Sequence, residues 1–137
     1  MNLEDPKTTI KSLLSYNWDV TGVGFTPIFS DEWYNPREMC PQVVVSHIST
    51  PICYVGLGAT KRRYEGTYAV DVWAQGDGEK RWKMKEEVDR IVHLRRRTPG
   101  VGLTFIRISS WRDMDELDRA PKIFRSQIQL VLLYFKA

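Results

Sequence analysis

Residues 64–75, YEGTYAVDVWAQ, form the stretch of sequence that decides the fold. Apolar and polar side chains alternate along it, which is the pattern of an antiparallel strand that is buried on one face. Gly76, Asp77 and Gly78 then interrupt the strand, and either Asp77 or Gly78 can cap a helix that begins at Glu79. The stretch therefore predicts a long strand that leads directly into a helix.

The predicted helix spans about residues 79–96. Met84, Val88 and Ile91 line one stripe of this helix, whereas Trp82 lies nearly opposite them. The helix can therefore cover a sheet on one side and still expose a tryptophan on the other.

Turn signals and β-branched runs predict the remaining elements. Asp5 and Pro6 are typical of a helix start, and this first helix should end near Asn17. Strands are expected at residues 25–29, 42–48, 103–109 and 123–135, with loops at 30–41 and 111–122. This order predicts an α+β fold, with a mixed, mostly antiparallel sheet of about five strands and two helices packed on one face.

Length and composition indicate one domain, residues 1–137. The 137 residues, 42% of them hydrophobic, suffice for one core and are too few for two ordinary domains. The net charge of +3 is low for a dedicated nucleic-acid binder. Residues 1–20 do not resemble a signal peptide, and no run reaches the roughly 18 apolar residues of a membrane helix. We expect a soluble intracellular protein with no membrane partner.

Residues 49–63, STPICYVGLGATKRR, contain conflicting signals. The apolar side chains call for burial, whereas Pro51, Gly56 and Gly58 weaken any fixed strand. The segment is either a hairpin extension or an arm. We expect an arm that is mobile in the isolated subunit and becomes ordered when an assembly buries its apolar side chains.

The histidines do not form a catalytic arrangement. His47 and its neighbour Ser46 point to opposite faces of a strand, so the imidazole cannot easily activate the hydroxyl. His93 follows Asp89 by four residues on the exposed side of the helix, as in an ordinary surface pair.

Metal and cofactor motifs also fail in detail. A nuclease would use Asp71, Glu65 or Glu79 as metal ligands, but the strand lacks the accompanying lysine. The acidic run at residues 113–118 lacks the glycine and glutamate of a calcium loop. The glycine runs at 22–25 and 56–58 lack the features of phosphate-binding loops. We expect no enzyme activity, no metal and no cofactor.

Cys40 and Cys53 have neither zinc-ligand nor framework spacing, which predicts two free thiols. Two groups of cations are candidates for contact with a polyanion. They are Lys61, Arg62 and Arg63 in the ambiguous segment and Arg95, Arg96 and Arg97 at the end of the helix. The second group lacks acidic neighbours in sequence, although a helix C-terminus favours cations in any case. Non-specific contact with DNA therefore stays an alternative.

The order and spacing of the elements resemble those of tail terminator and tail-completion proteins of tailed phages. The matching parts are LLSYN in the first helix, TPIFSDEW, PQVVVSHIS, YEGTYAVDVWAQ, EEVDRIVHL, and WRDMDELDR before RSQIQLVLLYF. The resemblance implies a non-enzymatic subunit of a homo-oligomeric ring, a hexamer, at the head-proximal end of the tail tube. Such a ring ends tube growth and binds the head connector or a neck protein.

The resemblance also implies a location in the virion, at the head–tail junction, after assembly in the host cytoplasm. The candidate interface residues are large side chains at expected surface positions, namely Trp33, Tyr34, Tyr54, Leu57 and Trp82. The cations of the two basic groups would contact DNA in the lumen. The alternatives are a neighbouring head–tail adaptor and a small nucleic-acid-binding module that uses the basic helix.

Overall fold

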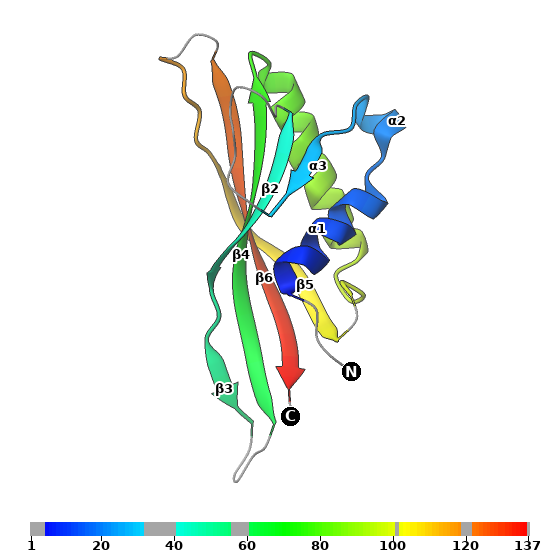
Figure 1. Ribbon diagram of the computed structural model, residues 1–137, viewed down its shortest axis with the longest axis vertical. Helices are drawn as coiled ribbons and strands as arrows, with labels where there is room; N and C mark the ends of the chain where they lie inside the picture. The colour runs from blue at the N-terminus through cyan, green and yellow to red at the C-terminus, as the bar shows by residue number, and fades with distance from the viewer. Residues whose placement is uncertain (1–4, 32–40, 56–60, 101, 119–121, 137) are drawn as a thin grey trace.

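The computed structural model describes residues 5–31, 41–55, 61–100, 102–118 and 122–136. These residues confirm the α+β class, with a six-stranded, mostly antiparallel sheet and three helices. The elements in chain order are α1 (Pro6–Asn17), α2 (Val20–Val23), β1 (Ile28–Ser30), β2 (Gln42–Ser49), β3 (Ile52–Tyr54), β4 (Arg62–Gln75), α3 (Gly78–Leu94), β5 (Leu103–Asp113) and β6 (Ile123–Lys136). The three helices lie on the same side of the long, twisted sheet (Figure 1).

Two strands of 14 residues form the centre of the sheet. β4 and β6 pair in one antiparallel register, from Arg62 opposite Lys136 to Gln75 opposite Ile123. The strand predicted at residues 64–75 therefore begins two residues earlier. The expectation that it is buried on one face only is wrong for residues 68–74, which are buried on both faces. The full order is β1-β2-β4-β6-β5, and β3 adds to the start of β4 beyond the end of β2.

One pair of strands at the edge of the sheet is parallel, whereas the other pairs are antiparallel. β1 is parallel to β2, with Ile28 opposite Gln42. β4 and β5 are each antiparallel to β6, so these two strands run in the same direction with β6 between them. Helix α3 therefore connects two strands of equal direction that are not neighbours.

Side-chain caps fix the starts of both long helices. The Asp5 carboxylate accepts a hydrogen bond from the Lys7 amide at 3.0 Å, and Pro6 occupies the first turn. The Asp77 carboxylate accepts from the amides of Glu79 and Lys80 at 2.9 and 3.3 Å. Each satisfies amides that a helix start leaves without partners. The Asp77 cap confirms one of the two alternatives read from the sequence.

The sequence reading missed helix α2. This element has four residues, which is too short for a helical period to be recognised. The Asp19 carboxylate caps it by accepting from the Gly22 amide at 3.0 Å, and Gly24, with a φ of 94°, ends it. The expectation of two helices is corrected to three for this reason.

The expected loop at residues 111–122 is also partly wrong. β5 continues to Asp113, the Met114 amide donates to the Arg125 carbonyl, and Glu116 bridges to Ile123. The acidic side chains are compatible with the sheet because they have partners there. Asp113 accepts from the Ser126 hydroxyl at 2.6 Å.

The main core lies between the helices and the sheet. The predicted stripe of α3, Met84, Val88 and Ile91, is fully buried against it. Fully burying one such side chain contributes about 1.5–3 kcal/mol. On the other face, no helix of the described ranges covers the sheet (Figure 1). None of the helices in the same ranges is both long and apolar enough to cross a bilayer.

Candidate subunit interface

A hairpin extends one end of the sheet. Strand β3 pairs with the start of β4, with Ile52 opposite Tyr64 and Tyr54 opposite Arg62. The Val55 amide donates to the Lys61 carbonyl at 3.0 Å, which continues the pairing by one step. The described residues of the ambiguous segment therefore follow the hairpin alternative (Figure 1). The expected mobility of the segment in an isolated subunit stays a prediction.

This hairpin exposes large apolar side chains. The exposed fractions are 52% for Ile52, 70% for Tyr54 and 46% for Val55. Successive residues of a strand point to opposite faces, so Ile52 and Tyr54 share one face whereas Cys53 and Val55 share the other. β6 pairs with the other side of β4 along this stretch, so β3 is the outer strand of three, and these side chains stay exposed at the edge. The hairpin thus has the composition of an element that packs against another molecule.

The structure describes two of the five interface residues that the sequence predicted. Tyr54 and Trp82 are exposed, with fractions of 70% and 49%. Trp33, Tyr34 and Leu57 lie outside the described residues, as does Cys40. Cys53 is a free, exposed thiol on β3.

Trp82 forms a cluster with Trp111 and Lys85, of which the sequence predicted only Trp82 as an interface residue. Its ring meets that of Trp111 on β5 edge to face, with centroids 6.2 Å apart. The Lys85 ammonium lies 4.1 Å from the Trp111 centroid and 4.9 Å from the Trp82 centroid. Lys85 is nearly buried, whereas Trp111 is 43% exposed. The sequence reading placed Trp111 in a loop, so its neighbourhood with α3 was not foreseen.

A groove of about 430 Å³ lies beside Trp82, between α2 and α3. Its lining residues are Asp19, Gly22, Val23, Trp82, Lys83, Glu86, Glu87 and Arg90. The buried Glu87 carboxylate joins α3 to the start of α2, because it accepts from the Asp19 amide at 2.6 Å. Arg90, on α3 itself, also donates to Glu87, from Nη2 at 2.8 Å. The Arg90–Glu87 hydrogen bond raises the pKa of Arg90 further. The groove walls are therefore fixed by charged contacts within the chain.

The hairpin cations lie over their own strand neighbours. Lys61 is 5.1 Å from the Phe135 ring centroid, and Arg62 is 5.7 Å from that of Tyr64. Arg63 pairs with Glu65 at 3.2 Å on the exposed surface. An exposed pair of this kind contributes little to stability.

The arginines at the end of α3 are exposed as well. Arg95 donates to the Asn17 side-chain oxygen at 3.1 and 3.2 Å, and Arg96 donates to the His93 carbonyl at 2.8 Å. Among the residues that the structure describes, no carboxylate forms an ion pair with Arg95, Arg96 or Arg97. No described contact joins this group to the hairpin cations.

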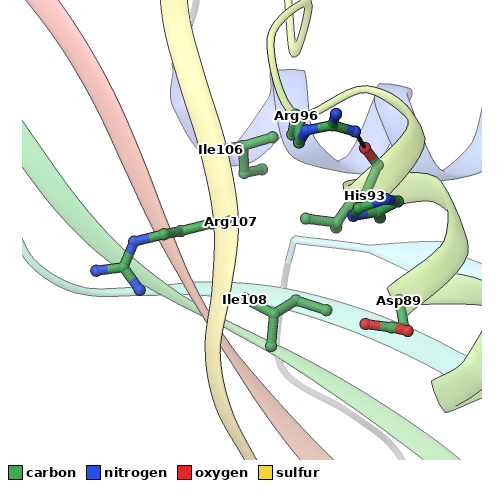
Figure 2. Close-up of a pocket in the computed structure, with 7 residues that line it drawn as sticks. Asp89, His93, Arg96, Ile106, Arg107 and Ile108 are labelled. Carbon is green, nitrogen blue, oxygen red and sulfur yellow. Dashed lines mark hydrogen bonds between the residues drawn. The ribbon is translucent and has the colours of Figure 1, made fainter.

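A smaller cleft of about 200 Å³ separates α3 from β5 (Figure 2). Ile106 and Ile108 point towards the helix, whereas Arg107 points away across the strand. His93 and Asp89 lie on the rim, and the hydrogen bond drawn there joins Arg96 to the His93 carbonyl.

His47 belongs to a polar cluster at the base of the hairpin. Its Nε2 lies 2.6 Å from the Thr50 hydroxyl, and its ring packs against Tyr68 at 4.9 Å. Burial, with a smaller contribution from Tyr134, raises the pKa of Tyr68 to about 12. These contacts hold the junction between β2 and the hairpin.

Asp71, which the sequence offered as a metal ligand, is paired with an arginine. Asp71 accepts from Arg125 Nε at 2.9 Å on the sheet face without helices. Within the described part of the chain, no three His, Cys, Asp or Glu side chains gather as a metal site would require.

Comparison with known proteins adds no relative. No protein-family model matches this chain, and no curated protein matches it significantly.

Proposed function

We propose that this protein is a structural subunit of a viral tail. Copies of the chain would form a ring at the head-proximal end of the tail tube, end tube growth and bind the head connector. The order of sequence segments suggests this role, and the exposed hairpin is the observation that supports it most directly. Ile52, Tyr54 and Val55, on the outer strand β3 and directly after it, expose between 46% and 70% of their surface.

The hairpin supports assembly for a simple energetic reason. Large apolar side chains gain about 1.5–3 kcal/mol each when a partner covers them fully. Ordering the hairpin costs part of that gain. Aromatic side chains such as Tyr54 and Trp82 are also enriched among the residues that dominate binding energy.

Native mass measurement and sedimentation test the proposal, first with the protein alone and then with tail tubes. The expected result is a closed homo-oligomer, a hexamer, that binds at tube ends and limits their length. A protein that remains monomeric in both preparations, and leaves tube growth unchanged, would contradict the proposal.

A second candidate is a DNA-binding module or a head–tail adaptor that contacts DNA. The observation that favours it is the exposed run Arg95, Arg96 and Arg97, which lacks carboxylate partners among the described residues. Replacing all three arginines should then weaken binding to short duplex DNA and reduce its salt dependence. Absence of binding at low salt excludes this candidate.

A further inference from the structure

Each subunit carries two exposed surfaces that are too far apart to contact each other within one chain. The first is the hairpin, residues 52–55 and 61–63. The second is the tryptophan groove, which is the cavity beside Trp82 together with Trp111. Trp111 lies opposite Ile128 of β6, and Ile128 lies opposite Val70 of β4. Val70 is eight residues along β4 from Arg62, so the two surfaces are separated by about 26 Å along the strand, at about 3.3 Å per residue.

The two surfaces also lie towards opposite edges of the sheet. The hairpin adds to β4 on the side that β2 occupies, whereas Trp111 belongs to the edge strand β5. A surface at one edge that binds a different surface at the other edge of the next copy gives a head-to-tail contact. Such contacts close into rings when the rotation between copies allows it.

The chemistry of the two surfaces is complementary. The hairpin presents Tyr54, Ile52 and the exposed residue Lys61, whose ammonium lies 5.1 Å from the Phe135 centroid of its own chain. The groove presents Trp82 and the half-exposed carboxylate of Glu86. Aromatic rings accept both apolar side chains and cations, so one tryptophan can contact either part of the hairpin.

The charges of the groove favour a cationic occupant. Its two lining cations already have partners in the chain, since Lys83 pairs with Glu79 at 3.4 Å and Arg90 with Glu87 at 2.8 Å. Three carboxylates, those of Asp19, Glu86 and Glu87, line the groove together with these two cations, so the lining as a whole is negatively charged. Glu86 also contacts Lys85 at 3.1 Å, which fixes its position beside the tryptophans.

From these observations we infer that the hairpin of one subunit docks in the tryptophan groove of the next copy. This inference rests on the proposed ring and names the surfaces that form it. Lys61 faces Glu86 of the neighbouring copy, and Tyr54 packs against Trp82.

A charge exchange tests the contact between Lys61 and Glu86. Lys61→Glu and Glu86→Lys should each raise the concentration needed for half-maximal ring formation about tenfold. The double variant should recover most of the loss. Arg107→Glu is the matched control, because Arg107 is exposed, points away from α3 and makes the same charge change outside both surfaces. Absence of recovery in the double variant overturns the pairing of these two residues.

A mixing experiment tests the head-to-tail geometry. Ile52→Ser/Tyr54→Ser removes the hairpin contact, and Trp82→Ala removes the groove contact, with thermal unfolding as the check that each variant is folded. Each variant alone should be monomeric. An equimolar mixture should give heterodimers in native mass spectra, because it contains one intact hairpin and one intact groove. Rings or monomers in the mixture overturn the inference.

The outcomes separate this inference from the proposed function. Wild-type rings without charge recovery and without heterodimers would leave the ring standing and show that the hairpin docks elsewhere, on another face, the tube protein or DNA. Failure of the wild-type protein to form rings, alone and with tubes, would remove both.

Discussion

Asp71 and Arg125 form a buried ion pair on the sheet face without helices. Arg125 donates to the Asp71 carboxylate at 2.9 and 2.8 Å, and its guanidinium lies 4.4 Å from the Trp73 ring centroid. Burial raises the pKa of Asp71 above its ordinary value of 3.8, although Arg125 acts in the opposite direction. Burial therefore opposes ionisation of Asp71, whereas Arg125 favours it.

We predict that Asp71→Asn lowers the free energy of unfolding by about 1.5–3 kcal/mol, because Arg125 loses its charged acceptor. The double replacement Asp71→Leu/Arg125→Met should cost less, since it leaves neither charge unpaired. Urea denaturation of the three proteins measures both effects. A double variant that is less stable than Asp71→Asn would contradict this account.

Tyr68 gives a prediction at high pH. Its pKa is raised from 10.0 to about 12 by burial, so between these values the native state keeps a proton that the unfolded chain releases. The contribution of Tyr68 to stability is therefore lost as pH rises through this window, by about 1.4 kcal/mol per pH unit. Denaturation between pH 10 and 12 should show a smaller fall for Tyr68→Phe than for the wild type. Equal falls would mean that Tyr68 titrates normally.

At the scale of elements, the hairpin can be followed through its own thiol. Cys53 is exposed in the subunit and lies between Ile52 and Tyr54 on β3. We predict that a maleimide labels Cys53 at least tenfold more slowly in the assembled ring than in the isolated subunit, because a partner covers the hairpin. Mass spectrometry of labelled peptides provides the rates.

Cys53→Ser is the control, since any remaining label then belongs to Cys40. Equal rates for Cys53 in the two states would show that the hairpin stays exposed after assembly. Limited trypsin digestion at Lys61, Arg62 and Arg63 separately tests whether the segment is mobile in the isolated subunit.

The sequence predicted those elements whose signal is local and repeated. Alternation along residues 64–75 gave β4, Asp77 gave the start of α3, and Met84, Val88 and Ile91 gave its buried stripe. The elements that were missed depend on distant partners. β5 extends past the expected residue 109 because β6 lies beside it, with Asp113 opposite Ser126. Likewise, Trp111 meets Trp82 only once α3 has packed on the sheet.

The same distinction applies to the candidate interface. The apolar content of residues 52–55 indicated that they need a partner but left a hairpin and an arm as alternatives, and the pairing of β3 with β4 was not foreseen. The groove between α2 and α3 could not be foreseen, because α2 itself has no periodic signal and Glu87 reaches Asp19 across 68 positions.

At the scale of the whole molecule, docking of the hairpin should change tryptophan fluorescence. Trp18 and Trp73 are 8% and 7% exposed in the subunit, whereas Trp82 and Trp111 are 49% and 43% exposed. We predict a shift of the emission maximum to shorter wavelength when rings form, since burial takes the exposed indoles out of water. Trp111→Phe retains an aromatic ring and should reduce the shift. An unchanged spectrum on assembly would contradict burial of these rings.

The position of β6 in the sheet has a consequence for how the protein is made. β6 is the last described element in the chain, yet it lies between β4 and β5 and pairs with both. During synthesis, β4 and β5 therefore emerge with no strand between them, and the sheet is completed only after Ile123–Lys136 leaves the ribosome. Until then, long strand edges are open to incorrect pairing. Translation that stops before Ile123 yields a chain without the strand that pairs with both β4 and β5, and such a chain cannot form this sheet.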